Sequence, residues 1–584
     1  MFLERCRRRK NGRDHVDWSL VESYRTARGS RHRVVAYLGE LSGGEKSGWA
    51  QLGRTLDGKR WVPPQPSLFD PPHDDEPADD EPVLVELRDL RLERMRHFGD
   101  VWLALGLWRL LGIDGLLEQL IPEGREEIPW RQMAAILTIA RFCAPSSELH
   151  IEDTWYRATA LDDLLGVPPE KVYTDRLYAA LDRLLPHKDA LETHSRQRLG
   201  DLFDLKYELL LYDITSTYFE GQCQGNTLAE RGYSRDSQPD CVQVLIGLVV
   251  TDEGFPLGYR VFAGNRHDAT TVAEVVQAME RNYGRASRVW VMDRGMVSEE
   301  NLEHLRKKER RYLVGTPKSQ LRRYEAEIAS GGWSEIREGL EVKLCPGPDG
   351  SETFILCRSA ERREKEKAMH AWAAERLAQG LRHLAQSCAK RPLSLGEVHE
   401  RIGRLREKYS RAARLFAVRV TAEADGKASL TWERREQWSE WAQLSEGCYL
   451  LRSNVTDWSA EDLWRAYTQL TEAEAAFRIQ KSDLALRPIW HQREERVQAH
   501  ILVCFLGYVL WKTLGKLCQA AGLGDCPRKV FEELSQLRAV DVVLPTRQGV
   551  EIRRRCVERP DPHQAILLQR LAMQTPESLP IHEM

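Results

Sequence analysis

The spacing of hydrophobic and polar positions changes near residue 205, and that change divides the chain. Beyond it, short apolar runs rich in Val, Leu, Ile and Tyr alternate with turn residues such as those at 252–254, a pattern typical of buried strands. Strands are predicted at 208–215, 241–251, 256–263, 288–293 and 311–316, and helices at 268–283 and 298–308. The predicted order is three strands, a helix, a strand, a helix and a strand.

The regions on either side of this alternation have other patterns. From 83 to 205, apolar residues recur every three or four positions, which predicts helices. Residues 320–445 combine strand-like pieces with a charged helical stretch at 359–412, and we interpret them as an insertion. The elements predicted after the insertion are a strand at 448–453 and helices at 460–483 and 494–520.

The first 82 residues divide into a module and a linker. Residues 1–60 alternate basic and apolar positions, which predicts a small strand-containing module whose basic face either binds phosphates or is merely solvated. Residues 61–82 combine repeated proline with clustered acidic residues, as linkers do. The other predicted divisions are a helical domain at 83–205, an α/β core in two parts at 206–319 and 446–520, the insertion at 320–445, and a C-terminal region at 521–584.

Charge and cysteine usage narrow the class of protein. The net charge of -3 hides a basic segment at 4–13 and an acidic one at 69–81, so it excludes no anionic partner. Twelve cysteines without a CxxC pair disfavour a zinc site or a disulfide framework and indicate a reducing cytoplasm. The longest apolar run, Ile501 to Trp511, is too short to span a bilayer, so no membrane partner is expected.

Two aspartates lie where apolar runs end. Asp213 follows LLLY and Asp293 follows VWVM. A carboxylate in such a place loses hydration unless a cation or hydrogen-bond donors compensate, and a divalent metal ion is one such compensation. For either aspartate alone, capping a turn or a helix is the more common role. The predicted strand order, however, can set the first and fourth strands side by side and bring the two carboxylates together.

A third carboxylate is expected from a helix further along the chain. Tyr467, Glu474 and Lys481 are seven residues apart, which is nearly two helical turns, so they share one stripe. Arg478 lies one turn beyond Glu474. An ordinary amphipathic helix with ion pairs shows the same pattern. The stripe therefore gains meaning only together with the two aspartates.

Together these residues resemble the bacterial insertion-sequence transposases of the DDE type, in the insertion-sequence-four superfamily, whose third motif is Tyr-x2-Arg-x3-Glu-x6-Lys. The spacing of that motif is kept, but Leu470 occupies the arginine position, as in a subgroup with a longer chain. The phosphate contact that the family's arginine makes is therefore expected from Arg478 or Arg487 instead. The stretches YDITSTYFEG, GYSRDSQPD, FAGNRHDATT and VMDRGMVSEENL follow in the family's order, and the resemblance extends from about 200 to 515.

The resemblance implies an α/β fold with a ribonuclease-H-like catalytic core and a β-rich insertion before the Glu helix. It assigns catalysis and metal binding to Asp213, Asp293 and Glu474, which would hold two Mg2+ ions, with Mn2+ as a substitute. The implied reaction is cut-and-paste transposition, in which hydrolysis at the terminal inverted repeats frees a 3'-OH that attacks either the opposite strand, to form a hairpin, or a phosphate of the target DNA. The implied partners are these double-stranded DNAs and, in the synaptic complex, a second copy of the chain. The implied location is the cytoplasm of a bacterium, at its nucleoid.

Further DNA contacts are expected around the Glu helix. The predicted DNA-binding residues are Tyr467, Arg478, Lys481, Arg487 and His491. Structural ion pairs are an equally open interpretation for some of these cations. The tryptophans of the insertion, Trp432, Trp438 and Trp441, are expected to pack in a core, with stacking on an unpaired base as the alternative. By analogy with the family, the helical domain at 83–205 is expected to bind the transposon end.

Two alternative functions remain open at this point. The stretch LLLYDITST resembles the start of haloacid-dehalogenase-type phosphatases, but that motif needs a second aspartate two positions on, where this chain has Thr215. A catalytically inactive, transposase-derived DNA-binding protein would share the fold and its basic faces. The presence of all three carboxylates favours a cleavage-competent site over such a descendant.

Overall fold

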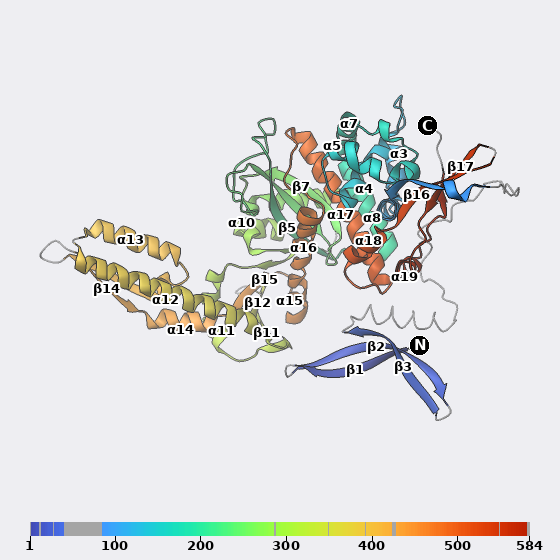
Figure 1. Ribbon diagram of the computed structural model, residues 1–584. Coiled ribbons are helices and arrows are strands. Elements are labelled where there is room, and N and C mark those ends of the chain that lie inside the picture. The colour runs from blue at the N-terminus through green and yellow to red at the C-terminus, as the bar shows by residue number, and fades with distance from the viewer. Residues whose placement is uncertain are drawn as a thin grey trace.

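The computed structural model describes residues 2–10, 13–26, 29–39 and 85–580, except 285–287, 348–349, 392, 423–427 and 548. In this part of the chain, helices and a large sheet form a mixed α/β body from which one long arm extends (Figure 1).

A nine-stranded mixed sheet forms the centre of the body, in the order β10-β11-β12-β15-β9-β8-β5-β6-β7. Strands β5, β8 and β9 are mutually parallel, and the remaining neighbours pair antiparallel. The bounds are β5 (Leu209–Tyr218), β6 (Gln243–Val250), β7 (Pro256–Ala263), β8 (Val289–Met292), β9 (Arg311–Gly315), β10 (Ser334–Arg337), β11 (Leu340–Pro346), β12 (Thr353–Ser359) and β15 (Cys448–Ser453). The order predicted for 208–316 is the order observed.

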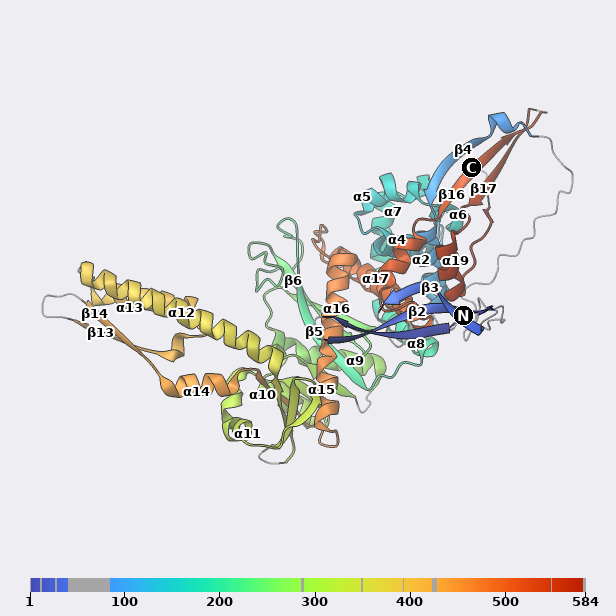
Figure 2. The same cartoon turned by 60° about the horizontal axis from the view of Figure 1, so that its bottom comes forward.

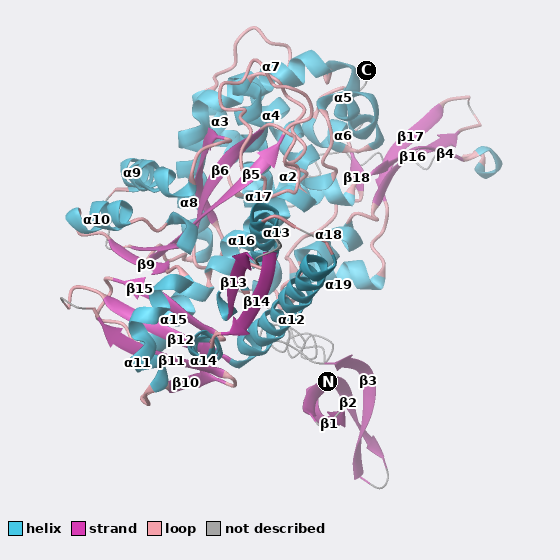
Figure 3. Cartoon of the chain, turned by 90° about the vertical axis from the view of Figure 1, so that its left-hand side faces the viewer, coloured by secondary structure: helices cyan, strands magenta, loops and turns pink. Residues whose placement is uncertain are grey.

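Helices cover both faces of this sheet (Figure 3). Alternate residues of a strand point to opposite faces, and Tyr212 of β5 packs in the core beneath α9 (Val272–Tyr283) and α10 (Glu299–Lys307). Its neighbour Leu211 lies in the opposite core, together with α16 (Leu470–Arg478) and α17 (Glu494–Ala520). Coverage on both sides explains why these strands are apolar almost throughout.

The helix α17 joins the sheet to the helical region that precedes it. It packs against α2, α4, α7 and α8, so the two regions share one hydrophobic core. By length and composition α17 could cross a membrane, but 83% of its most apolar window is buried inside the protein, as in the core helix of a soluble protein. The other helices of this layer are α2 (Gly99–Leu110), α3 (Ile113–Leu120), α4 (Trp130–Cys143), α5 (Glu148–His150), α6 (Leu161–Leu165), α7 (Thr174–Leu184) and α8 (Lys188–Phe203).

The arm consists of residues 360–445, which leave the sheet after β12 and return to it at β15 (Figure 2). At its base Ser359 N donates to Gly447 O at 3.0 Å. The strands β10, β11 and β12, which lie within the region interpreted as an insertion, extend the central sheet. The elements of the arm are α12 (Ala360–Lys390), α13 (Leu395–Lys408), β13 (Phe416–Ala422), β14 (Ala428–Arg434) and α14 (Glu436–Ser445), and α11 (Glu325–Ala329) lies before it.

The three tryptophans of the insertion considered above lie against hydrophobic cores. Trp432 and Trp438 pack on the core of the arm, and Trp441 packs on a smaller core at its base. These positions agree with the expected packing role.

A second sheet joins the two ends of the chain, in the order β18-β17-β16-β4. The helical pattern of 83–205 does not predict β4 (Arg91–His97), whose partner β16 (Arg538–Pro545) comes from the C-terminal region. The remaining elements of that region are α18 (Pro527–Leu534), β17 (Glu551–Val557), α19 (Pro562–Arg570) and β18 (Ser578–Leu579), and α15 (Ala460–Thr468) lies earlier, between β15 and α16.

Buried ion pairs attach this second sheet to the helical layer. Arg96 of β4 donates to Asp162 at 2.6 Å and to Asp163 at 2.5 Å. Arg555 of β17 pairs with Asp163 and, at 2.7 Å, with Asp541 of β16. Asp163 is thus shared by two arginines, and all three side chains are buried.

The N-terminal module contains the strands expected of it. β1 (Phe2–Lys10), β2 (Arg13–Thr26) and β3 (Gly29–Gly39) form an antiparallel three-stranded sheet. The linker predicted at 61–82 lies outside the described residues.

Candidate active site

The strand register places Asp213 and Asp293 next to each other. Tyr212 of β5 pairs with Met292 of the parallel strand β8, so the residues that follow them leave the pair side by side. Neighbouring strands are about 5 Å apart. Because Tyr212 and Met292 both face the α9 and α10 side, alternation turns the next two side chains to the opposite face. Both carboxylates therefore lie on the face that α16 covers.

The helix predicted over 460–483 is divided where it approaches this face. Ser459 caps α15, since its hydroxyl accepts a hydrogen bond from Asp462 N at 3.1 Å. At its other end Thr468 Oγ1 donates to Arg465 O at 2.8 Å. After Gln469 the chain continues as α16 and ends in a π-helical turn, Ile479–Asp483. α16 lies on β5 and β6.

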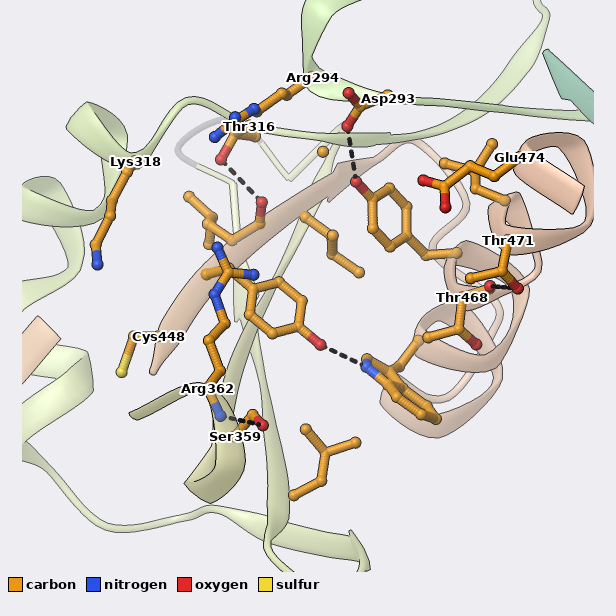
Figure 4. Close-up of a pocket in the computed structure, with 18 of the residues that line it drawn as sticks. Asp293, Arg294, Thr316, Lys318, Ser359, Arg362, Cys448, Thr468, Thr471 and Glu474 are labelled. Carbon is orange, nitrogen blue, oxygen red and sulfur yellow. Dashed lines mark hydrogen bonds between the residues drawn. The ribbon is translucent and has the colours of Figure 1, made fainter. Parts of the chain in front are cut away.

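Glu474 lies on α16 and reaches the same space as the two aspartates. All three carboxylates line one cavity of about 530 Å³. Figure 4 shows Asp293 and Glu474 at one end of that cavity, with Lys318 and Arg362 toward the other. Residues far apart in the chain thus bring three negative charges to one site.

The arrangement of the three carboxylates shifts the pKa of Asp213. Burial, together with the charges of Asp293 and Glu474, raises its pKa to about 6. The hydrogen bond that Ile214 N donates to Asp213 Oδ1 at 2.8 Å and the charge of Arg235 act in the opposite direction. The net shift shows that the site favours neutralisation of Asp213, by a proton or by a cation.

The donor chemistry of the site fits a hard divalent cation. Carboxylate oxygens are the ligands that Mg2+ and Mn2+ take, and the pKa of Asp213 is raised by burial and by the neighbouring charges of Asp293 and Glu474. Within the described residues, no three His, Cys, Asp or Glu side chains are gathered closely enough to hold a metal ion as they stand. Metal binding therefore requires the side chains of Asp213, Asp293 and Glu474 to draw together.

Tyr467 contacts a carboxylate of the site. Its hydroxyl donates to Asp293 Oδ1 at 3.4 Å, and burial, with the charge of Asp293, raises the pKa of Tyr467. The ring approaches the end of β9 so closely that a Cβ atom on Gly315 would collide with the hydroxyl oxygen. A glycine at 315 is therefore a condition for the position of Tyr467.

The structure brings Lys481 and Arg487 to a third aspartate. Lys481 Nζ donates to Asp236 Oδ1 at 2.8 Å, and Arg487 donates to the same oxygen. Burial lowers the pKa of Lys481, although Asp236 raises it. Both cations are thus engaged within the protein.

Arg478 and His491 lie in different surroundings. Arg478 is exposed, and among the described residues no hydrogen bond or ion pair holds it. His491 Nε2 lies 3.3 Å from Glu148 Oε1, and the His500 ring lies 5.5 Å from the His491 ring, tilted by 59°. Although burial raises the pKa of Glu148, its hydrogen bond and charge interaction with His491 lower it to about 2. His491 therefore joins the helical layer to the core.

Four cations that the motif did not single out form the far wall of the cavity. They are Arg294, Lys318, Arg337 and Arg362. Arg337 lies over the Trp464 ring at 5.2 Å and Arg362 over the Tyr449 ring at 5.0 Å. No local pattern in the sequence predicted them, because they come from four separate elements, namely the short helical turns 294–296 and 318–324, the strand β10 and the helix α12. The cavity therefore joins an anionic end to a cationic, aromatic end.

The chain is similar to two families of known proteins. A model of the transposase DDE domain matches residues 204–510. A model of the N-terminal domain of the IS1634 transposase family matches residues 3–60. No curated protein matches the chain.

One solved structure aligns with much of the chain. It is the cryo-EM structure of the piggyBac transposase synaptic complex with hairpin DNA, at 9% sequence identity, covering 78% of this chain and 83% of that chain. Its TM-score of 0.34 is too low to relate the two folds.

Proposed function

The chain belongs to the transposase DDE domain family, and from that membership we propose that it moves an insertion sequence by cut-and-paste transposition. In this proposal it binds the terminal inverted repeats of its element, cleaves there by metal-dependent hydrolysis, and joins the freed 3'-OH to target DNA. The phosphatase alternative is dropped, because the family match spans all three carboxylates and Thr215 stands where a phosphatase needs its second aspartate.

One observation carries the assignment of the catalytic residues. Asp213 follows Tyr212 within β5, Asp293 follows Met292, the residue of the parallel strand β8 that pairs with Tyr212, and Glu474 lines the same cavity from α16. This arrangement supports a ribonuclease-H-like core with Asp213, Asp293 and Glu474 as catalytic residues and metal ligands.

When bound between these carboxylates, two Mg2+ ions, or Mn2+ in their place, would activate a water and stabilise the leaving 3' oxygen. The protein's own part is to hold the ligands and the DNA. Tyr467 orients Asp293 through its hydrogen bond. The cations Arg294, Lys318 and Arg362 line the cavity where phosphates beside the cut would lie, and Arg478 extends this surface on α16.

The other regions receive roles in the same proposal. The helical layer at 83–205 would bind the transposon end, and the arm at 360–445 would contact the DNA that leaves the cavity. A synaptic complex that holds two transposon ends would contain two copies of the chain.

Strand cleavage is the direct test of the proposal. Linear DNA with the element's own terminal repeats is incubated with the purified protein in Mg2+ or in EDTA, and the strands are resolved. We expect nicking at the repeat boundary only with the metal. Asp293→Asn and Glu474→Gln are expected to lower the rate by roughly 1,000-fold, since a metal ion supplies several kcal/mol of transition-state stabilisation.

A matched control lies on the same helix as Glu474. Glu472 faces Lys512 at 3.7 Å instead of the cavity, so Glu472→Gln is expected to cleave like the wild type. DNA binding without cleavage by the wild type would support the inactive DNA-binding alternative. No binding to the repeats would overturn the transposase proposal.

Gly315→Ala is expected to lower the cleavage rate about 100-fold, the cost of a displacement of about 1 Å in an active site. The added methyl group would push the Tyr467 hydroxyl from its place beside Asp293. Single-turnover cleavage at saturating Mg2+ measures the effect.

Removing the colliding atom provides the control. In Gly315→Ala with Tyr467→Phe, the methyl group no longer meets a hydroxyl, and we expect faster cleavage than in Gly315→Ala alone. Equal rates in the two variants would show that Gly315 does not act through Tyr467.

A further inference from the structure

The loop between β5 and β6 carries two adjacent charged residues that reach opposite faces of the sheet. Arg235 N donates to Ser216 Oγ at 3.0 Å, and its guanidinium donates to Asp268 Oδ2 at 2.6 Å, on the α9 side. Asp236 instead meets Lys481 on the α16 side. The loop therefore wraps the end of β5, the strand that carries Asp213.

This loop is built into the sheet. Glu230 and Gln243 exchange backbone hydrogen bonds at 3.1 and 3.0 Å. Gln243 Nε2 donates to Gly264 O at 2.8 Å and to Tyr233 O at 3.2 Å. A Cβ atom on Gly264 would collide with the backbone of Gln243 and of Glu230. The segment that presents Asp236 is therefore fixed in place.

Asp236 is the anion of a buried three-member ion cluster. Its side chain is 3% exposed, and the Lys481 side chain is 9% exposed. Lys481 and Arg487 both donate to Oδ1, while Oδ2 is buried without a hydrogen-bond partner in the structure. A buried carboxylate of this kind depends on its cations, and they depend on it.

The two cations come from the segment that directly follows Glu474. Lys481 lies in the π-helical turn that ends α16, and such turns are frequent at functional sites. Arg487 precedes Ile489, whose N–H donates to Tyr218 O at 3.0 Å and so extends the edge of β5. Asp236 thus connects the end of the Glu474 helix with the strand of Asp213.

We propose that Asp236 is a positioning residue, which binds Lys481 and Arg487 and thereby sets the distance of Glu474 from Asp213 and Asp293. In this arrangement Lys481 acts within the protein and does not contact a DNA phosphate. The effect on catalysis rests on the proposed function. The ion cluster of Asp236, Lys481 and Arg487, which we call the clamp, is a property of the chain without DNA.

Two measurements on Asp236→Asn, Lys481→Met and the double variant test the clamp. In amide hydrogen exchange without DNA or metal, we expect faster exchange over 470–484 in each variant. In single-turnover cleavage we expect rates about 10- to 100-fold lower, the usual effect of removing a group that orients a metal ligand. The double variant should be no slower than the slower single variant, because the two residues act as one unit.

Measurements of DNA affinity distinguish a positioning role of Lys481 from a direct contact between Lys481 and a DNA phosphate. Affinity for the terminal repeats and its dependence on salt should be unchanged in all three variants, since a lost phosphate contact would reduce the salt dependence. The exposed Asp240 of the same loop provides the matched control, and Asp240→Asn is expected to behave like the wild type throughout.

Two results would overturn the proposal. One is Asp236→Asn with wild-type cleavage and wild-type exchange over 470–484. The other is weaker DNA binding with reduced salt dependence in Lys481→Met alone, which would assign Lys481 to a phosphate. If the wild type itself fails to cleave, the proposed function fails, while the exchange measurement still decides whether the clamp exists.

Discussion

Asp213→Asn is expected to stabilise the metal-free protein by up to about 3 kcal/mol at pH 8 while it lowers strand cleavage by roughly 1,000-fold. The gain follows from the raised pKa of Asp213, about 6 in the folded protein against 3.8 for an ordinary aspartate. That shift of about 2 units corresponds to about 3 kcal/mol. The variant should thus gain stability where it loses function.

The sign of the effect depends on pH. An acid whose pKa is raised by folding binds its proton more tightly in the folded state. Asp213 therefore does not lower the free energy of unfolding below pH 3.8. The destabilisation grows as the pH rises from 3.8 to about 6 and stays constant at higher pH. Urea unfolding in EDTA should give equal stabilities for wild type and Asp213→Asn near pH 3.5 and the full difference at pH 8.

Saturating metal is expected to remove most of this difference. A ligand that binds only the folded state at about 100 times its Kd adds about 2.7 kcal/mol, and only the wild type retains all three carboxylates. Asp457, with a side chain 67% exposed, provides the control, since Asp457→Asn should show no pH-dependent gain. A gain that is the same at both pH values would contradict the electrostatic cause and point to packing.

Asp163→Ala is expected to lower the free energy of unfolding by about 3–5 kcal/mol, because it leaves two buried arginines without their shared anion. Arg96 and Arg555 are 3% and 6% exposed, and both pair with Asp163. Loss of these two ion pairs would weaken the attachment of the second sheet, in which β4 pairs with β16, to the helical layer. The measurement is the urea midpoint at unchanged m-value.

Glu93 provides a matched substitution in the same sheet. It pairs with Arg91 at 3.2 Å, and both side chains are at least one third exposed. Glu93→Ala should therefore cost at most about 1 kcal/mol. Equal losses in Asp163→Ala and Glu93→Ala would contradict the role assigned to burial.

Local pattern predicted the strands at the centre of the fold, and it singled out three carboxylates that line one cavity in the structure. Apolar runs near 210, 246 and 290 predict strands because both faces of the sheet are covered, and the seven-residue spacing places Tyr467 and Glu474 on one stripe. The division of that helix after Thr468 was not predicted, because it has no signature in hydrophobic spacing.

The sequence pattern did not predict contacts between segments that are far apart in the chain. The pairing of β4 with β16 joins opposite ends of the chain, and nothing in the alternation of either strand selects the other. The motif likewise placed Lys481 on the carboxylate stripe, but its partner Asp236 comes from a loop more than 200 residues earlier. Spacing shows which side chains share a face, and only the fold shows what they meet.

The arm leaves the central sheet after β12 and returns to it at β15, the strand beside β12. It follows Ser359, the last residue of β12, and ends just before Gly447, which precedes the neighbouring strand β15, and Ser359 N donates to Gly447 O at 3.0 Å. Lengthening, shortening or exchanging the segment between them would leave the strand order and the three carboxylates in place. If the arm contacts DNA as proposed, its reach can therefore vary during evolution, or by cassette exchange in the laboratory, provided that the first turn of α12, which carries Arg362 of the cavity, is kept.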